Sequence, residues 1–326
     1  MSNTTIEDGP ALIGTSGDSL REAFGKALVE FAPEFPQMVV LDADIAGGTG
    51  THHFRGAYPK RFLQFGIAEQ NMMAAAGGLA STGLIPVVTS FAVFCLRALE
   101  QARLSIAYSQ RNVKIVASHP GLDVGPDGGS AQCLEDMAAF RAIPGMMVLS
   151  PADPEEMRLA TRAMLAHQGP VYMRTGRSPA ERIFGEEHEF ELGRGQIVRP
   201  GLDLTIVACG VEVGRALRAA KELALEGIDA RVVNMPTIAP MDADLLECCS
   251  EETHAFVTAE DHSVHGGLGS AVSEALAQRR PAPIEFVGVR EFGCSGEPDE
   301  LAQHFCIDAR SIAIAARRVV LRKRSM

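Results

Sequence analysis

Four short segments of this sequence place acidic, aromatic or histidine side chains where an apolar run passes into a helix or a glycine-rich loop. They are residues 40–44, 65–69, 90–94 and 118–127. In open α/β sheets ligands bind beyond the carboxyl ends of the strands, so these junctions are the first candidates for chemistry. They offer carboxyl groups that can move protons, a histidine, and rings on which a flat ligand could stack.

Each candidate also has a structural explanation when it is considered alone. Glu69 could complement the dipole at the start of a helix. Phe91 and Phe94, at helical spacing, are more often core residues than a ligand platform. His119 stands before a proline, as loop histidines do, and Asp127 precedes a glycine, as in a turn. A functional interpretation therefore needs a pattern that joins these residues.

The elements that would position these side chains alternate between β-branched strands and longer amphipathic helices. In the first half we expect helices over 19–30, 69–81, 92–109, 132–140 and 154–167, and strands over 38–41, 62–67, 85–88, 113–117, 147–149 and 171–174. In the second half we expect helices over 213–226, 242–249 and 269–278, and strands over 204–208, 230–233, 255–260 and 284–287. This alternation predicts an α/β fold with two doubly wound domains and mainly parallel sheets. The predicted domains are 16–185 and 201–326, with a disordered tail over 1–15 and a linker over 186–200.

The bulk composition is that of an ordinary soluble globular protein. The 326 residues are 46% hydrophobic and 22% charged, and the length favours more than one core. A net charge of −11 argues against a nucleic-acid surface, and no apolar run approaches the ~20 residues of a membrane helix. The N-terminus has no signal-peptide pattern, and seven cysteines without a CxxC pair fit reduced thiols. We therefore expect a cytoplasmic location and no contact with nucleic acid or membrane.

Read in order and at their spacing, the candidate segments resemble the transketolase family. The strings that carry the resemblance are Gly-Ile-Ala-Glu-Gln-Asn-Met at 66–72, Pro-Val-Val at 86–88, Phe-Ala-Val-Phe at 91–94, the histidine at 119, Val-Gly-Pro-Asp-Gly at 124–128, Leu-Glu-Asp at 134–136, Val-Val-Asn-Met-Pro-Thr-Ile at 232–238 and Glu-Asp-His-Ser-Val-His-Gly-Gly-Leu-Gly at 260–269. They extend over nearly the whole chain, from 19 to about 315. The resemblance implies the pyrimidine-binding and C-terminal domains of a split, thiamine diphosphate-dependent transketolase. Within the last string, Gly266–Gly269 lacks the full spacing of a nucleotide motif, which favours a tight turn over an anion cradle.

The resemblance assigns a cofactor site to the first domain. Glu69 would hydrogen-bond the aminopyrimidine ring nitrogen of thiamine diphosphate and share a proton with it, which promotes loss of the thiazolium C2 proton. Phe91 and Phe94 would supply the apolar face on which the pyrimidine stacks. Ile67 and Asp44 match further family positions beside the cofactor.

The same resemblance assigns a substrate site. Arg21, His119 and Arg174 fall where the family grips the terminal phosphate of a sugar, and Asp127 matches an acid that binds a substrate hydroxyl. Arginine suits a phosphate because its guanidinium forms two parallel charged hydrogen bonds. The resemblance also implies that His119 is catalytic, together with Glu69. Ala131 is a departure, because transketolases carry a histidine here beside the reacting carbon, and this change puts the sugar donor in question.

A second departure concerns the metal. The family holds the diphosphate through Mg²⁺ with a Gly-Asp-Gly string and a later pair of asparagines, which supply the oxygen ligands that Mg²⁺ requires. This sequence has no Gly-Asp-Gly and no two adjacent asparagines. We therefore expect no metal ligand in this chain, and a partner subunit that holds Mg²⁺ and the diphosphate in an α₂β₂ assembly.

Two alternatives remain open. The β subunit of a 2-oxoacid dehydrogenase has the same two domains, but the phosphate-gripping residues and the Val-Gly-Pro-Asp-Gly loop favour a two-carbon ketol transfer between sugar phosphates. A non-catalytic assembly subunit would fit the loss of histidine at Ala131, whereas the retention of Glu69, Phe91 and Phe94 argues against it.

Overall fold

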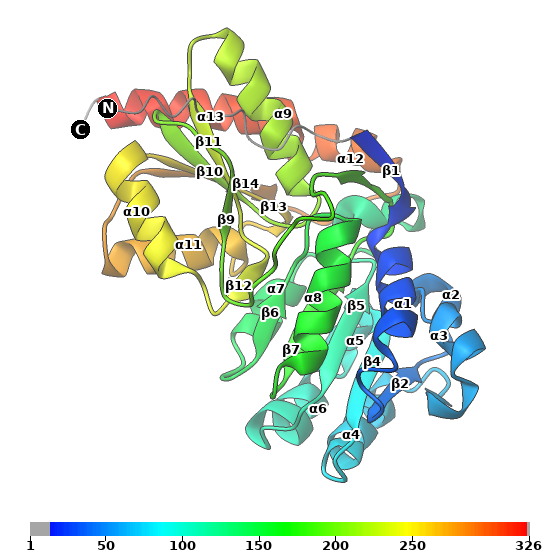
Figure 1. The fold of residues 1–326 in the computed structure, drawn as a ribbon. Helices are drawn as coiled ribbons and strands as arrows, with labels where there is room; N and C mark the ends of the chain where they lie inside the picture. The colour runs from blue at the N-terminus through cyan, green and yellow to red at the C-terminus, as the bar shows by residue number, and fades with distance from the viewer. Residues whose placement is uncertain (1–13, 325–326) are drawn as a thin grey trace.

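A computed structural model describes residues 14–324, and it contains two α/β domains built on separate sheets (Figure 1). The first sheet has seven strands in the order β12-β6-β7-β5-β4-β2-β3. Its strands are β2 (Met38–Asp42), β3 (Phe62–Gln64), β4 (Ile85–Phe91), β5 (Lys114–Ser118), β6 (Met147–Leu149), β7 (Val171–Thr175) and β12 (Thr237–Ala239). All neighbours are parallel except β12, which runs antiparallel to β6. The predicted doubly wound α/β class is confirmed.

Helices cover both faces of this sheet. The first set comprises α1 (Leu20–Phe31), α8 (Pro154–Ala166), α2 (Ala46–Thr49) and α3 (His52–Ala57), and the second comprises α4 (Glu69–Ala80), α5 (Ala92–Arg97), α6 (Leu99–Gln101) and α7 (Asp136–Arg141). Helices α1 and α8 pack together because Phe24, Leu28, Met157 and Met164 form one buried cluster with the sheet. Ser19 and Asp153 cap these two helices through their side chains.

The second sheet has five strands in the order β14-β13-β10-β11-β9. Its strands are β9 (Gln196–Arg199), β10 (Leu204–Ala208), β11 (Ala230–Asn234), β13 (Phe256–Ser263) and β14 (Ile284–Val289). Helices α9 (Glu212–Leu225) and α13 (Ala309–Arg324) lie against one another on one face, and α10 (Ala243–Thr253) and α11 (Leu268–Gln278) lie on the other. Helix α12 (Pro298–His304) contacts the loop that contains Asp127.

The two domains share one apolar core. Val233, Phe256 and Leu268 of the second domain belong to the same buried cluster as Tyr172 and Phe140 of the first. Because the core is continuous across the junction, the second domain is held firmly against the first. The short antiparallel ribbon of β1 (Gly14–Ser19) and β8 (Pro179–Arg182) lies beside this junction.

The elements differ from expectation in several places. The expected helix over 92–109 is divided into α5, α6 and a π-helix over Ala102–Tyr108. Strand β9 occupies part of the stretch expected to be a linker, and β12 leaves the second half of the chain to pair with the first sheet. Strand β1 begins at Gly14, so residues 14 and 15 of the tail expected to be disordered belong to a strand, and residues 1–13 lie outside the described residues. Between residues 14 and 324 no helix is long and apolar enough to cross a membrane.

Candidate functional site

The carboxyl ends of four adjacent parallel strands bring most of the predicted residues to one edge of the first sheet. Strands β5, β4, β2 and β3 are neighbours in that order. At these ends lie His119 just after β5, Phe91 as the last residue of β4, Asp44 just after β2 and Ile67 after β3. Asp44 is exposed with φ 65°, and its N–H donates to Gln64 Oε1 at 2.9 Å. This edge is where a doubly wound sheet binds its ligands.

An aromatic stack stands at the centre of this edge. The rings of Phe91 and Phe94 are nearly parallel, with centroids 5.6 Å apart, and the His119 ring lies 3.7 Å from Phe91 on centroids. Gly48 of α2 approaches this stack so closely that a Cβ there would lie 2.6 Å from the Phe91 ring. Only a glycine fits at this position, so the loop after β2 is shaped around the stack.

Glu69 lies at the first turn of α4, directly after this loop edge. Its side chain is 3% exposed and forms an ion pair of 3.1 Å with Arg97, whose own side chain is 54% exposed. Within residues 14–324 this is the carboxylate's only side-chain partner. The guanidinium of Arg97 also lies 5.4 Å from the Phe94 ring. The carboxyl group therefore stands beside the aromatic stack and close to the molecular surface, where Ile67 is 78% exposed.

The hydrogen bonds of His119 define its protonation state. Ser118 Oγ donates to Gly48 O at 2.8 Å and is 2.7 Å from His119 Nδ1. Since the hydroxyl proton of Ser118 is used toward Gly48, Nδ1 is the donor to Ser118 and Nε2 keeps its lone pair. Burial, together with the positive charges of Arg21 and Arg177, lowers the pKa of His119 to about 3. His119 is thus a neutral imidazole that offers Nε2 as an acceptor.

Two arginines face this histidine, and only one of them was predicted. Arg21 Nη1 donates to Gly48 O at 3.3 Å. Arg177 lies beyond the end of β7 and forms a long ion pair of 3.9 Å with Asp127. Both line a pocket of about 520 Å³ between the two domains. The structure therefore brings Arg21, His119 and Asp127 together, with Arg177 as a fourth member.

Arg174 does not belong to this group. Its Nε and Nη2 donate to the two oxygens of Asp136 at 2.8 and 2.7 Å, and its Nη1 donates to Asp261 O at 3.1 Å. Tyr172 donates to the same carboxylate at 2.6 Å. Since the guanidinium of Arg174 is buried and its hydrogen bonds go to protein, the prediction that it grips a phosphate is not supported by the geometry.

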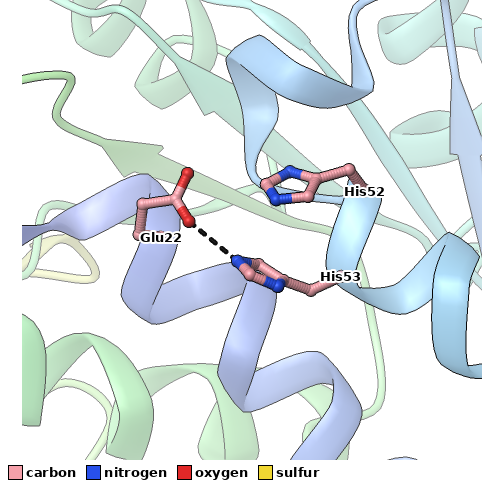
Figure 2. A group of neighbouring side chains, drawn as sticks. All are labelled: Glu22, His52 and His53. Carbon is pink, nitrogen blue, oxygen red and sulfur yellow. Dashed lines mark hydrogen bonds and ion pairs between the residues drawn. The ribbon is translucent and has the colours of Figure 1, made fainter.

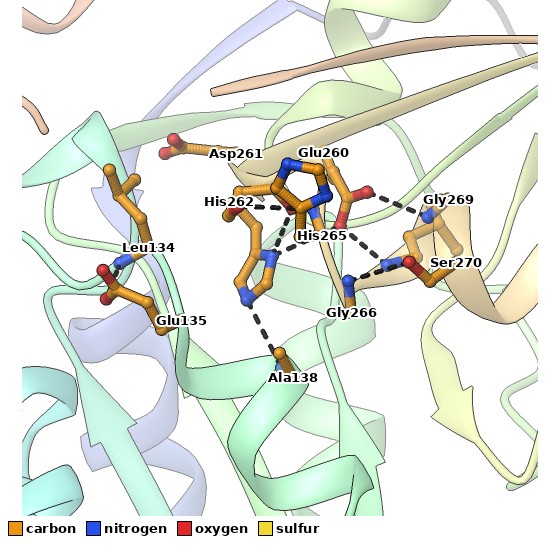
Figure 3. A network of polar contacts seen from close by, with 12 residues as sticks. Leu134, Glu135, Ala138, Glu260, Asp261, His262, His265, Gly266, Gly269 and Ser270 are labelled. Atoms are coloured by element: carbon orange, nitrogen blue, oxygen red, sulfur yellow. Dashed lines mark hydrogen bonds and ion pairs between the residues drawn. The ribbon is translucent and has the colours of Figure 1, made fainter. Parts of the chain in front are cut away.

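The Glu-Asp-His string of the second domain forms hydrogen bonds to a loop and a helix of the first domain, and Figure 3 shows His262 beside Ala138 of α7. Asp261 accepts hydrogen bonds from Leu122 N at 2.8 Å and Asp123 N at 3.1 Å. His262 accepts from Ala138 N through Nε2 at 3.3 Å and donates from Nδ1 to Ser263 O at 2.7 Å. These contacts cross between the domains, and we name the buried group of Asp136, Arg174, Glu260, Asp261 and His262 the interdomain lock.

Glu260 explains why the glycine-rich stretch at 266–269 needs no external anion. Its carboxylate accepts from Leu268 N at 2.6 Å and Gly269 N at 2.8 Å, so it occupies the N-terminus of α11 (Figure 3). A Cβ at Gly267 would lie 2.0 Å from Glu260 Oε2. Burial raises the pKa of Glu260 to about 7 even though these hydrogen bonds oppose the shift.

Ala131 belongs to a loop that follows Asp127 and rests on the second domain. Its N–H donates to Gly128 O at 3.0 Å, and the neighbouring Gln132 donates to Cys294 O at 2.9 Å. A Cβ at Gly129 would lie 2.5 Å from Gly293 O. The loop is therefore fixed by close backbone approach, and the methyl group of Ala131 is half-buried within it.

Three contributors to this site carried no strong sequence signal. Arg177 stands three positions after Arg174, and composition alone does not tell which of the two turns toward the pocket. Ser118 and Gly48 act through a hydrogen bond and a close approach, which appear only when strands β2, β4 and β5 lie side by side.

Comparison with known proteins identifies the family. The pyrimidine-binding domain of transketolase matches residues 17–181, and the transketolase C-terminal domain matches residues 193–312. This chain belongs to the transketolase family, whose reaction is thiamine diphosphate-dependent ketol transfer.

The chain is similar to separate subunits as well as to halves of longer enzymes. It is 43% identical over 306 residues to the 6-deoxy-6-sulfo-D-fructose transketolase subunit SqwH of Clostridium sp., which covers 93% of this chain and 95% of that one. A solved split gene transketolase, described as an inactive β4 tetramer, is 44% identical with a TM-score of 0.87, over 94% of this chain and 99% of that one. Human transketolase is 34% identical over 310 residues, which are 93% of this chain and 50% of that protein.

Proposed function

We propose that this chain is the pyrimidine-binding subunit of a two-chain transketolase and that its active site is completed by a separate N-terminal-half subunit. The observation that carries the proposal is the position of Glu69. This carboxyl group is only 3% exposed and stands beside an aromatic stack, but its ion-pair partner Arg97 is 54% exposed and Ile67, two residues before it, is 78% exposed. Half of a site of this kind calls for a second surface to cover it.

The residues at this edge suit one half of thiamine diphosphate. Phe91 and Phe94 present flat apolar faces to a pyrimidine ring, and Glu69 can hydrogen-bond its ring nitrogen. When bound, the cofactor supplies an electron sink for the carbon–carbon bond change. The sequence offers no Gly-Asp-Gly or paired asparagines for Mg²⁺, so we assign the metal and the diphosphate to the partner.

Within this half-site each residue has a defined task. Glu69 holds a proton at the ring nitrogen, and the two phenylalanines exclude water from that contact. Neutral His119 presents Nε2 to a substrate hydroxyl, which can donate to it. Arg21 and Arg177 provide the positive charge for a sugar phosphate, and Asp127 accepts from a sugar hydroxyl. Asp44 and Ile67 contact the cofactor from the neighbouring strand ends.

Three observations favour ketol transfer with a partner over the alternatives. The paired positive charges beside His119 suit a phosphorylated sugar better than a 2-oxo acid destined for a lipoyl group. Retention of Glu69 with its aromatic neighbours argues against a purely structural subunit. The related split transketolase solved as a β4 tetramer is described as inactive, which supports the view that a chain of this kind needs a partner. We propose that the two subunits form an α₂β₂ assembly in the cytoplasm. Light scattering of the reconstituted enzyme tests the assembly, and an active one-to-one dimer would contradict it.

The donor sugar is proposed to differ from xylulose 5-phosphate close to the reacting carbon. Ala131 can neither donate a hydrogen bond nor move a proton, and it leaves more room than the histidine of the family. A relative of 43% identity is named for a sulfonated fructose, which supports a specialised donor.

A donor panel on the chain mixed with its partner, thiamine diphosphate and Mg²⁺ tests this function. We expect ketol transfer from ketose phosphates or related anions, slow turnover of xylulose 5-phosphate, and a gain on that sugar in Ala131→His. Equal and fast turnover of xylulose 5-phosphate by wild type and Ala131→His would show that Ala131 does not determine donor specificity. Decarboxylation of 2-oxo acids would favour the dehydrogenase subunit, and absence of any turnover would favour the assembly subunit.

A further inference from the structure

Three potential metal ligands converge outside the proposed active site. Glu22 of α1 and the adjacent His52 and His53 of α3 each offer one ligand atom, and these atoms all lie within 4.8 Å of one another. Figure 2 shows the carboxylate and both imidazole rings turned toward a common space. All three residues are partly buried, so the group is neither in the core nor a fully solvated surface cluster.

The backbone around this group is held tightly enough to fix the ligand positions. A Cβ at Gly25 of α1 would lie 2.1 Å from Gly50 O, and a Cβ at Gly50 would lie 2.1 Å from Arg21 O. Gly50 has φ 75°, a conformation that glycine adopts without strain and that turns the chain into α3. Helix α1 therefore approaches closely the backbone of Gly50, the turn between α2 and α3, and the three ligands lie beside this turn.

The side chains are already oriented toward one another. His53 Nε2 and Glu22 Oε2 are 2.7 Å apart, with 32% and 29% of their side chains exposed. Within the part of the chain that the structure describes, His52 Nδ1 is buried without a hydrogen-bond partner. A buried ring nitrogen without a partner is uncommon, and this one belongs to a ligand of the group.

The ligand chemistry favours a transition metal over Mg²⁺. Two imidazole nitrogens and one carboxylate oxygen form the type of set that binds Zn²⁺, whereas Mg²⁺ prefers oxygen ligands alone. Around a tetrahedral Zn²⁺ the ligand atoms are about 3.3 Å apart, given bond lengths of roughly 2.0–2.2 Å. The present separations are at most 4.8 Å, and that between His53 Nε2 and Glu22 Oε2 is 2.7 Å, so they lie on both sides of this value and small side-chain rotations would reach it. The partial exposure of the group leaves a fourth position for water.

We propose that Glu22, His52 and His53 bind one Zn²⁺ ion that joins α3 to α1. The ion replaces the proton shared between His53 and Glu22. The segment between the two helices contains Gly48, whose carbonyl accepts from Arg21 and Ser118 at the active-site edge. The metal therefore fixes the loop that carries Gly48, and it is separate from the Mg²⁺ that we assign to the partner subunit.

The test is a titration of the full-length chain with Zn²⁺ and, separately, with Co²⁺. Wild type should bind one more equivalent of Zn²⁺ than the double variant His52→Gln/His53→Gln. The Co²⁺ form should show visible d–d absorption from this site without the charge-transfer band of a thiolate, which separates it from binding at exposed cysteines. His304→Gln, an exposed histidine on α12, is the matched control and should bind as wild type does.

Hydrogen exchange adds a readout of the structural role. Zn²⁺ should slow exchange of the amides at 49–54 in wild type and leave them unchanged in the double variant. Glu22→Gln keeps an acceptor for His53 and should preserve the fold while it weakens Zn²⁺ binding. Equal Zn²⁺ stoichiometry in wild type and the double variant, or Zn²⁺ binding without slower exchange at 49–54, would overturn the proposal.

Discussion

The edge that contains Glu69 and the interdomain lock are both rich in buried charge, but they satisfy that charge differently. In the interdomain lock, the Asp136 carboxylate accepts two hydrogen bonds from Arg174 and one from Tyr172. Its charge is therefore balanced by groups of the same chain. Among the described residues, Glu69 has one side-chain partner, Arg97, which is itself more than half exposed. A saturated network stabilises a fold by itself, whereas an unsaturated carboxyl group at a surface is available to a ligand.

The largest expected effect follows from changing the unsaturated group. Glu69→Gln keeps the shape and one hydrogen bond to Arg97 but cannot share a proton with the cofactor ring. Proton transfer of this kind contributes about 10²–10⁴-fold, so exchange of the thiamine C2 proton in the reconstituted enzyme should slow by that order. Stability to urea should change little, because the ion pair with Arg97 reaches the surface.

Glu274→Gln is the control for this change, since Glu274 forms its ion pair with Arg141 on the surface. Its exchange rate should equal that of wild type. A Glu69→Gln enzyme with a normal exchange rate would show that another group activates the cofactor.

A substitution that breaks the interdomain lock should lower the free energy of unfolding and leave the chemical step of turnover unchanged. Arg174→Leu leaves Asp136 buried without its charge partner, which typically destabilises a protein by about 3–5 kcal/mol. Urea unfolding of the chain measures this loss. A change below about 1 kcal/mol would mean that water enters the lock and replaces the arginine.

The same substitution at Arg177 sharpens the comparison. Arg177→Leu removes a half-exposed arginine of the pocket, so its unfolding midpoint should stay near wild type. Its kcat/KM for a phosphorylated donor should fall roughly 10-fold or more, since hydrogen bonds to charged groups contribute about 1.5–3 kcal/mol. Matching stability losses in the two variants would contradict the assignment of different roles.

A smaller effect is expected from the pH dependence of the lock. Burial and the charge of Arg174 lower the pKa of His262 to about 4. Because the folded protein resists protonation of this ring, its stabilising contribution is complete above pH 6.5 and is lost as the pH falls toward 4. Glu260 acts oppositely, since its raised pKa favours the folded state as the pH falls from about 7 toward 4.5.

His262→Gln should therefore remove the acid-sensitive contribution and leave that of Glu260. The difference in unfolding free energy between wild type and variant should shrink by up to roughly 3 kcal/mol between pH 6.5 and 4. Chemical denaturation across this range measures it. Parallel pH profiles of the two proteins would show that His262 is not the titrating group.

The sequence predicted the helices and strands and the edge that contains Glu69 better than it predicted the interdomain lock. Helix α4 and strand β4 follow from local patterns, and the string around Glu69 carries its own family signal. The family resemblance assigned Arg174 to the phosphate, but the direction in which a strand-end side chain turns cannot be read from the sequence. That direction is decided by Asp136, more than thirty positions away, and by the second domain.

Pairing across the domains was equally hidden. The three residues of β12 join β6 of the other half of the chain, a contact that short segments do not reveal because register depends on the assembled sheet. The proposed Zn²⁺ group likewise forms only when Gly25 of α1 meets Gly50 in the turn before α3.

Cofactor binding tests most directly whether the edge that contains Glu69 is half of a site shared with a second subunit. Calorimetric titration of the isolated chain with thiamine diphosphate and Mg²⁺ should show weak or no binding, because only the pyrimidine half of the site is present. Addition of the N-terminal-half subunit should create Mg²⁺-dependent binding and ketol transfer together. Tight, Mg²⁺-dependent binding to this chain alone would contradict the account of a site divided between two subunits.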